Sequence, residues 1–180
     1  MAYTSSQVVQ AVPTGINSAL VLITSTTFTD DISINNCFSA TYDNYKVVIT
    51  KIVASSGAMS WRFRTGGVDN TNNNYSYGGG GVNTSSGLFA SVGSRRNEPN
   101  WRPFDNATDA DGTSTAFDVL LPFATANTVC NGGAGWDQDI VAVGFVTMVF
   151  NASTSFDGFS LFKTGGTLAG TVTVYGYTKS

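Results

Sequence analysis

The chain of 180 residues contains no histidine, which limits the chemistry that it could perform. Histidine is the usual general base and a common zinc ligand. Carboxylate chemistry remains open, because glycoside hydrolysis needs only two acids that flank the scissile bond. The candidate acids are Asp105, Asp109, Asp111, Asp118, Asp137, Asp139 and Asp157. No spacing among them indicates a paired site, and turns or strand ends account for them better. We therefore expect a protein without catalytic residues.

Two short segments could bind an ion or a phosphate. Residues 105–112 (DNATDADG) carry alternating carboxylates followed by glycine, as an oxygen-lined calcium site does. The distal glutamate of an EF-hand is missing, since TSTAFDV follows, so an ordinary loop is the favoured interpretation and a metal the alternative. Residues 78–81 (GGGG) are not followed by the Lys-Ser/Thr of a phosphate-binding loop. We predict no metal site and no cofactor.

Aromatic side chains are the stronger signal for binding. Four of them lie in Gly- or Asn-rich stretches that we predict to be loops, where they could anchor a protein interface or stack on sugar rings. The alternative is that they fold back over the ends of the domain. Two more lie in the closing strand. The candidate partner or receptor contacts are Tyr75, Tyr77, Trp101, Trp136, Tyr175 and Tyr177.

The composition excludes several classes of protein. Nine Lys and Arg residues against twelve Asp and Glu residues give a net charge of −3, so no basic surface for nucleic acid is expected. No run of about 18 apolar residues predicts a membrane span. The first residues lack the pattern of a signal peptide, which predicts synthesis in a cytoplasm. Cys37 and Cys130 have no disulfide-framework spacing, and two separate buried thiols are favoured over a bridge.

The pattern along the chain predicts an all-β fold. Strands are expected at 19–28, 44–54, 58–65, 115–121, 139–150 and the closing segment 169–179, with others between them, about eight in total. No segment sustains the apolar spacing of an amphipathic helix. The number and spacing of the strands favour a two-sheet antiparallel β-sandwich of jelly-roll type over residues 19–180, preceded by a polar arm at 1–18. Residues 66–87 and 95–112 are predicted to be irregular.

In the closing strand, alternation places Val172 and Val174 on one face and Tyr175 and Tyr177 on the other. We expect the valines to face the core. In the segment 59–65, Met59, Trp61 and Phe63 should likewise share one face and the arginines the other.

Three stretches resemble structural proteins of tailed-bacteriophage virions, especially of phages of aquatic bacteria. They are CFSATYDNYKVVI (37–49), MSWRFRTGGVDNTNNNYSY (59–77) and FDGFSLFKTGGTLAGTVTVYGYTKS (156–180). In that family such domains are the C-terminal parts of tail fibres or small separate virion proteins. The resemblance implies a β-sandwich that forms a homotrimer, and it supplies no catalytic residues.

The expected role is therefore a capsid decoration or cement protein, or a short knob-like appendage, located in the virion after synthesis in the bacterial host. Its partners would be copies of itself and the major capsid or tail protein, with the arm at 1–18 as the attachment segment. The alternative is a tail-fibre or receptor-binding protein that contacts a host surface glycan. A free carbohydrate-active enzyme is a weaker third alternative.

Overall fold

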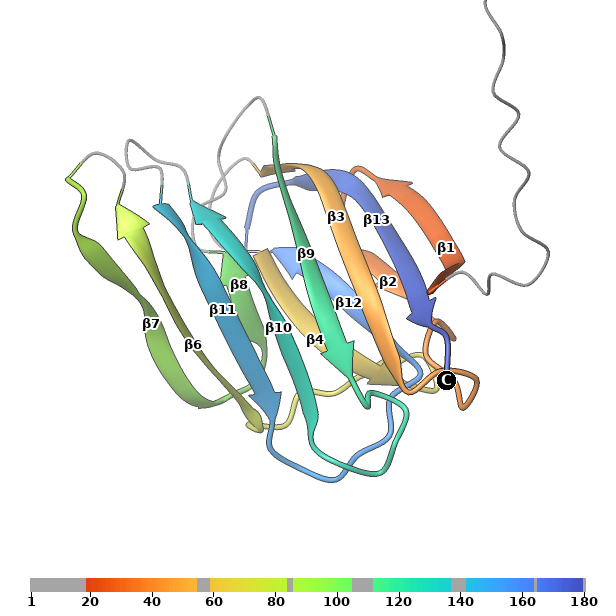
Figure 1. The fold of residues 1–180 in the computed structure, drawn as a ribbon. Coiled ribbons are helices and arrows are strands. Elements are labelled where there is room, and N and C mark those ends of the chain that lie inside the picture. The colour runs from red at the N-terminus through yellow and green to blue at the C-terminus, as the bar shows by residue number, and fades with distance from the viewer. Residues whose placement is uncertain are drawn as a thin grey trace, which may run out of the picture.

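The computed structural model describes residues 19–54, 59–83, 86–104, 112–136, 142–163 and 165–179, and all regular elements in these ranges are strands. They form two antiparallel sheets packed face to face, so the predicted all-β sandwich is confirmed. Figure 1 shows the larger sheet in front of the smaller one. The predicted arm at 1–18 lies outside the described residues.

The larger sheet has eight strands. In spatial order they are β1 (Leu20–Phe28), β13 (Leu168–Tyr177), β3 (Asn44–Ala54), β9 (Thr113–Leu120), β10 (Thr128–Trp136), β11 (Ala142–Phe150), β6 (Tyr75–Asn83) and β7 (Phe89–Glu98). The smaller sheet contains β2 (Ile32–Ile34), β12 (Gly158–Lys163), β4 (Met59–Thr65) and β5 (Val68–Asp69), with β8 (Trp101–Phe104) paired to β4. The described strands number thirteen against the expected eight or so, because the glycine-rich segments also form strands.

The core lies between the sheets and is built by alternation along each strand. In β13 every second residue is buried, and Val172 and Val174 are wholly inaccessible, which confirms the predicted inward face. Met59, Trp61 and Phe63 of β4 are also fully buried, as their alternation predicts. Such alternation fixes the register, because a slip of one residue would turn the apolar side chains outward.

Aromatic rings join the two sheets. Trp101 of the smaller sheet meets Phe117 of the larger sheet edge-to-face at 4.8 Å. Within the smaller sheet, Trp61 stacks on Phe159 with ring centroids 4.1 Å apart. Aromatic pairs in these arrangements are worth roughly 0.5–1.5 kcal/mol beyond the area that they bury. The centre of the sandwich is therefore mainly aromatic.

The expectation of a long irregular region at 66–87 is wrong for 68–69, which form the short β5, and for 75–83. Residues 75–83 form β6, which pairs along its length with β11, and Gly78–Gly81 lie in the middle of it. Glycine has low strand propensity, but here the backbones approach closely. A Cβ at Gly144 would lie 2.2 Å from the carbonyl oxygen of Gly80, and one at Gly79 would lie 2.0 Å from that of Phe145. The glycines are thus required by the sheet.

Residues 95–112 were also predicted to be irregular, and part of this prediction is wrong. Residues 95–98 belong to β7, and β8 follows at Trp101–Phe104. Residues 105–111, most of the calcium-loop candidate, lie outside the described residues, so that alternative stays a prediction. Cys37 and Cys130 are free and buried, as expected for separate thiols.

Candidate functional site

Three of the six predicted contact residues are in the core, and their assignment to exposed loops is wrong. Tyr75 and Trp101 are fully buried in β6 and β8, and Tyr77 is 8 % exposed in β6. The Tyr75 hydroxyl accepts a hydrogen bond from the Phe63 backbone N–H at 2.9 Å and donates one to the Asn70 carbonyl at 3.1 Å. It therefore satisfies buried backbone groups in a place where no partner molecule reaches it.

Trp136 is the last residue of β10, so it too belongs to a strand rather than to a loop. Its backbone pairs with Ala142 of β11. The position of its side chain lies outside what the structure describes, and its role as a contact stays a prediction.

The remaining two candidates, Tyr175 and Tyr177, lie on the outer face of the larger sheet and are half-buried. Tyr175 pairs with Lys46 of β3 in the strand register. Lys46 in turn pairs with Asp118 of β9. Direct partners in antiparallel strands share a face, so these side chains stand together on the outside. We call Lys46, Asp118, Tyr175 and Tyr177 the tyrosine face.

A three-membered polar cluster fixes the tyrosine face. The Tyr177 hydroxyl donates to Asp118 Oδ1 at 2.5 Å, and Lys46 Nζ donates to the same oxygen at 2.9 Å. The Lys46 amine also lies 3.5 Å from the Tyr177 hydroxyl. Because β3 lies between β13 and β9, the tyrosine and the aspartate join across an intervening strand. These contacts therefore hold the polar groups of the cluster in fixed positions beside the two tyrosine rings.

The protonation equilibria reflect this geometry. Burial alone would raise the pKa of Asp118, but hydrogen bonds from Tyr177 and Lys46 outweigh it and lower that pKa. The hydrogen bond to Asp118 raises the pKa of Lys46. Burial, followed by the hydrogen bond to Asp118, raises the pKa of the Tyr177 phenol. At neutral pH Asp118 is therefore a carboxylate, Lys46 an ammonium group and Tyr177 a neutral phenol.

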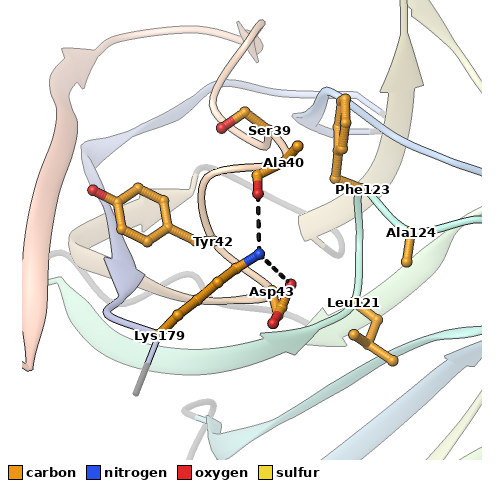
Figure 2. Close-up of a pocket in the computed structure, with 8 residues that line it drawn as sticks. All are labelled: Ser39, Ala40, Tyr42, Asp43, Leu121, Phe123, Ala124 and Lys179. Carbon is orange, nitrogen blue, oxygen red and sulfur yellow. Dashed lines mark hydrogen bonds and ion pairs between the residues drawn. The ribbon is translucent and has the colours of Figure 1, made fainter.

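An open hollow of about 220 Å³ lies at the adjacent end of the sandwich (Figure 2). We call it the terminal hollow; it is lined by Ser39, Ala40, Tyr42, Asp43, Leu121, Phe123, Ala124 and Lys179. Lys179 Nζ forms an ion pair with Asp43 Oδ1 at 2.8 Å and donates to the Ala40 carbonyl at 3.1 Å. A second depression, lined in part by Asp43, Lys179 and Tyr177, connects the terminal hollow to the tyrosine face.

The wall of the terminal hollow opposite the ion pair is apolar. Leu121 and Phe123 are 41 % and 37 % exposed, and Figure 2 shows both on the far side from Lys179. Leu121 adopts a φ of 56°, which is uncommon for any residue except glycine. Its backbone N–H is held by the Asp43 carbonyl at 3.0 Å. Backbone strain of this kind is found at binding sites more often than elsewhere, and it marks the terminal hollow as the candidate binding site.

Together the two regions have the composition of a site for a neutral, polyhydroxylated or amphipathic partner. Their charges are paired, and their aromatic rings adjoin carboxylate and carbonyl oxygens. Tyr175 and Tyr177 were predicted from the sequence as contacts, and Asp118 as a possible acid. Lys46, Asp43, Phe123 and Lys179 were not predicted as site residues. No local pattern marks these residues, because the turns and the closing strand bring them together from distant parts of the chain.

The described residues contain no group of three or more Cys, Asp or Glu side chains that could hold a metal ion. No helix long and apolar enough to cross a membrane occurs in the described part of the chain. Comparison of the chain with protein-family models, curated proteins and solved structures finds no match.

Proposed function

We propose that this chain is a non-enzymatic structural protein of a tailed-bacteriophage virion, either a capsid decoration or cement protein or a short knob-like appendage. The observation that supports this proposal most is the solvent exposure of several large apolar side chains. Phe89, Leu88 and Phe145 are 71 %, 68 % and 60 % exposed. Large exposed apolar side chains that lie together are typical of interaction surfaces. The resemblance of three stretches to virion proteins is the reason for proposing that the assembly is a virion.

In this proposal the partners are copies of the same chain, as a homotrimer, and the major capsid or tail protein of the particle. The sandwich would project outward, and residues 1–18 would attach it to the shell or tail. The low share of charged residues, 12 %, is compatible with a surface that neighbouring subunits cover.

Labelling of whole virions with an antibody against this chain tests the proposal. We expect the label on intact particles, and its position on head or tail distinguishes decoration protein from appendage. Deletion of residues 1–18 should leave a folded sandwich that no longer joins particles. Label restricted to the unassembled lysate, or full incorporation of the truncated protein, would contradict the assignment or the role of the arm, respectively.

A second candidate function is favoured by the tyrosine face and the terminal hollow. A tail-fibre or receptor-binding protein would use such a surface for a host glycan, with the rings of Tyr177 and Phe123 against sugar rings and Asp43 and Lys179 toward hydroxyl groups. Binding to glycan arrays by the wild type and by Phe123→Ala tests this. Binding that Phe123→Ala abolishes supports the second function. Absence of binding, or binding that persists in Phe123→Ala, counts against this use of the site.

A further inference from the structure

The outer face of the larger sheet carries a second feature, next to the tyrosine face, on β10, β11, β6 and β7. Phe145 projects from β11, and its direct partners on both neighbouring strands are glycines: Gly133 of β10 and Gly80 of β6. Val146, the next residue along β11, is fully buried, so Phe145 points away from the core. Phe145 thus has no side chain directly opposite it on either neighbouring strand.

The two glycines beside Phe145 are not equivalent. A Cβ at Gly80 would fall 2.2 Å from Cζ of Phe89, so the Phe89 ring already lies over Gly80. At Gly133 the nearest atom to such a Cβ is the Gly144 carbonyl oxygen, 4.0 Å away. Gly133 therefore marks an empty shallow hole next to a projecting ring. We call Phe145, Phe89, Leu88, Val82, Gly80 and Gly133 the phenylalanine patch.

We propose that the phenylalanine patch is the contact between copies of this chain, with Phe145 of one copy placed over Gly133 of another. The patch contains both a projection and a matching hole, and a self-complementary surface is what a two-fold contact between two identical chains requires. This contact therefore pairs two copies and is separate from the contacts of the homotrimer in the proposed function. None of its residues is charged, so the contact would not bring like charges of two acidic chains together. Phenyl rings that meet bare glycine backbone can also fill the space between facing sheets, which pack roughly 10 Å apart.

The face is also accessible to a second copy. Strand β7 ends the strand order of the larger sheet, so the patch extends to the border of the sandwich. Across the described residues no further strand lies over this face of β10, β11 and β6, as Figure 1 shows. The inference concerns the pairing of two copies, so it depends neither on the homotrimer of the proposed function nor on the virion assignment.

The experiment is light scattering coupled to size-exclusion chromatography of the purified full chain over a concentration series. The test variants are Phe145→Ser, which removes the projection, and Gly133→Leu, which fills the hole from outside. The matched control is Leu22→Ser on β1, at the opposite border of the same sheet, where the side chain is 59 % exposed. Thermal unfolding of each variant verifies that it folds.

We expect the wild type to be an oligomer and both patch variants to raise its dissociation constant by about tenfold or more, with Leu22→Ser unchanged. A wild-type oligomer that Phe145→Ser and Gly133→Leu leave intact would overturn the patch contact but not self-association. A wild type that stays at the 18.9 kDa of one chain at high micromolar concentration would overturn both. Antibody labelling of virions tests the virion assignment independently of these measurements. Failure of the patch contact and failure of the virion assignment can therefore be distinguished.

Discussion

Tyr177 of the closing strand donates a 2.5 Å hydrogen bond to Asp118 of β9, and the bond passes over β3, which lies between the two strands. Lys46 of β3 contributes its amine to the same carboxylate oxygen. Three strands that are distant in the sequence are thereby joined on the outside of the sheet, in addition to their backbone ladders.

Asp118 should make the stability of the fold depend on pH at the acidic end. Its pKa in the folded state is below the ordinary value of 3.8, so its contribution is present above that value and is lost as the pH falls through the lowered pKa. Asp118→Asn should flatten the loss of stability below about pH 4. Urea unfolding over a pH series measures this, with the exposed Asp30→Asn as control. An unchanged acid dependence in Asp118→Asn would contradict the role of the cluster.

Lys46 should act at the alkaline end with the opposite sign. Its pKa in the folded state is above the ordinary value of 10.5, so its stabilising contribution is present below that value and is lost as the pH rises through the raised pKa. Lys46→Met should flatten the alkaline loss of stability, read from the same unfolding series extended upward in pH. A steeper alkaline loss in Lys46→Met would show that the sign is wrong.

Val174→Ala should destabilise the fold more than Tyr177→Ala does. The Val174 side chain is fully buried, and its truncation leaves a partial cavity at a cost of about 1–3 kcal/mol. Tyr177 is half-buried on the outer face, so its loss removes a surface cluster rather than core packing. Denaturant unfolding compares the two variants, and sizing shows whether either one alters assembly. A larger loss for Tyr177→Ala would contradict the assigned faces.

Tyr75→Phe should cost about 1–3 kcal/mol of unfolding free energy, although it removes a single oxygen atom. The Tyr75 hydroxyl is the acceptor for the buried N–H of Phe63, and the variant leaves that donor without its partner. Tyr175→Phe, on the half-buried outer face, is the matched control and should change stability by less than about 0.5 kcal/mol. Equal effects of the two variants in chemical unfolding would argue against the buried hydrogen bond.

Two adjacent glycines of β10 should respond differently to the same substitution. A Cβ at Gly132 would lie 2.2 Å from the Phe117 ring and 2.5 Å from the Ala116 carbonyl oxygen, so Gly132→Ala should destabilise by about 1–3 kcal/mol. Gly133→Ala meets open space and should be neutral or stabilising by up to about 1 kcal/mol. Thermal unfolding of the two variants measures the difference. A Gly133→Ala variant less stable than Gly132→Ala would contradict the direction in which the β10 side chains point.

The fold class, the main strands and the inward faces of the most regular strands can be predicted from residue patterns alone. Strands β3, β4, β9 and β13 alternate apolar and polar residues, and this alternation can be recognised without a structure because the two faces of a strand have different surroundings. The separate cysteines and the inward Val172 and Val174 follow from the same reasoning.

The positions of the glycine-rich segments, and of the aromatic residues that were predicted to lie in loops, depend on tertiary contacts. Gly78–Gly81 have poor intrinsic strand propensity, yet they lie at the centre of β6, paired with β11. At Gly79 the Phe145 carbonyl oxygen of β11 lies too close for any side chain, and at Gly80 the Phe89 ring occupies the place of a Cβ. Tyr75 and Trp101 adjoin turn-forming residues in the sequence, yet they are buried because the opposite sheet supplies an aromatic partner for each, Phe63 for Tyr75 and Phe117 for Trp101. Asp118 and Tyr177, 59 residues apart, come within one hydrogen bond because β13 enters the sheet next to β3 rather than next to its neighbour in the chain. Contacts of this kind depend on the order of strands in space, and local residue patterns do not encode that order.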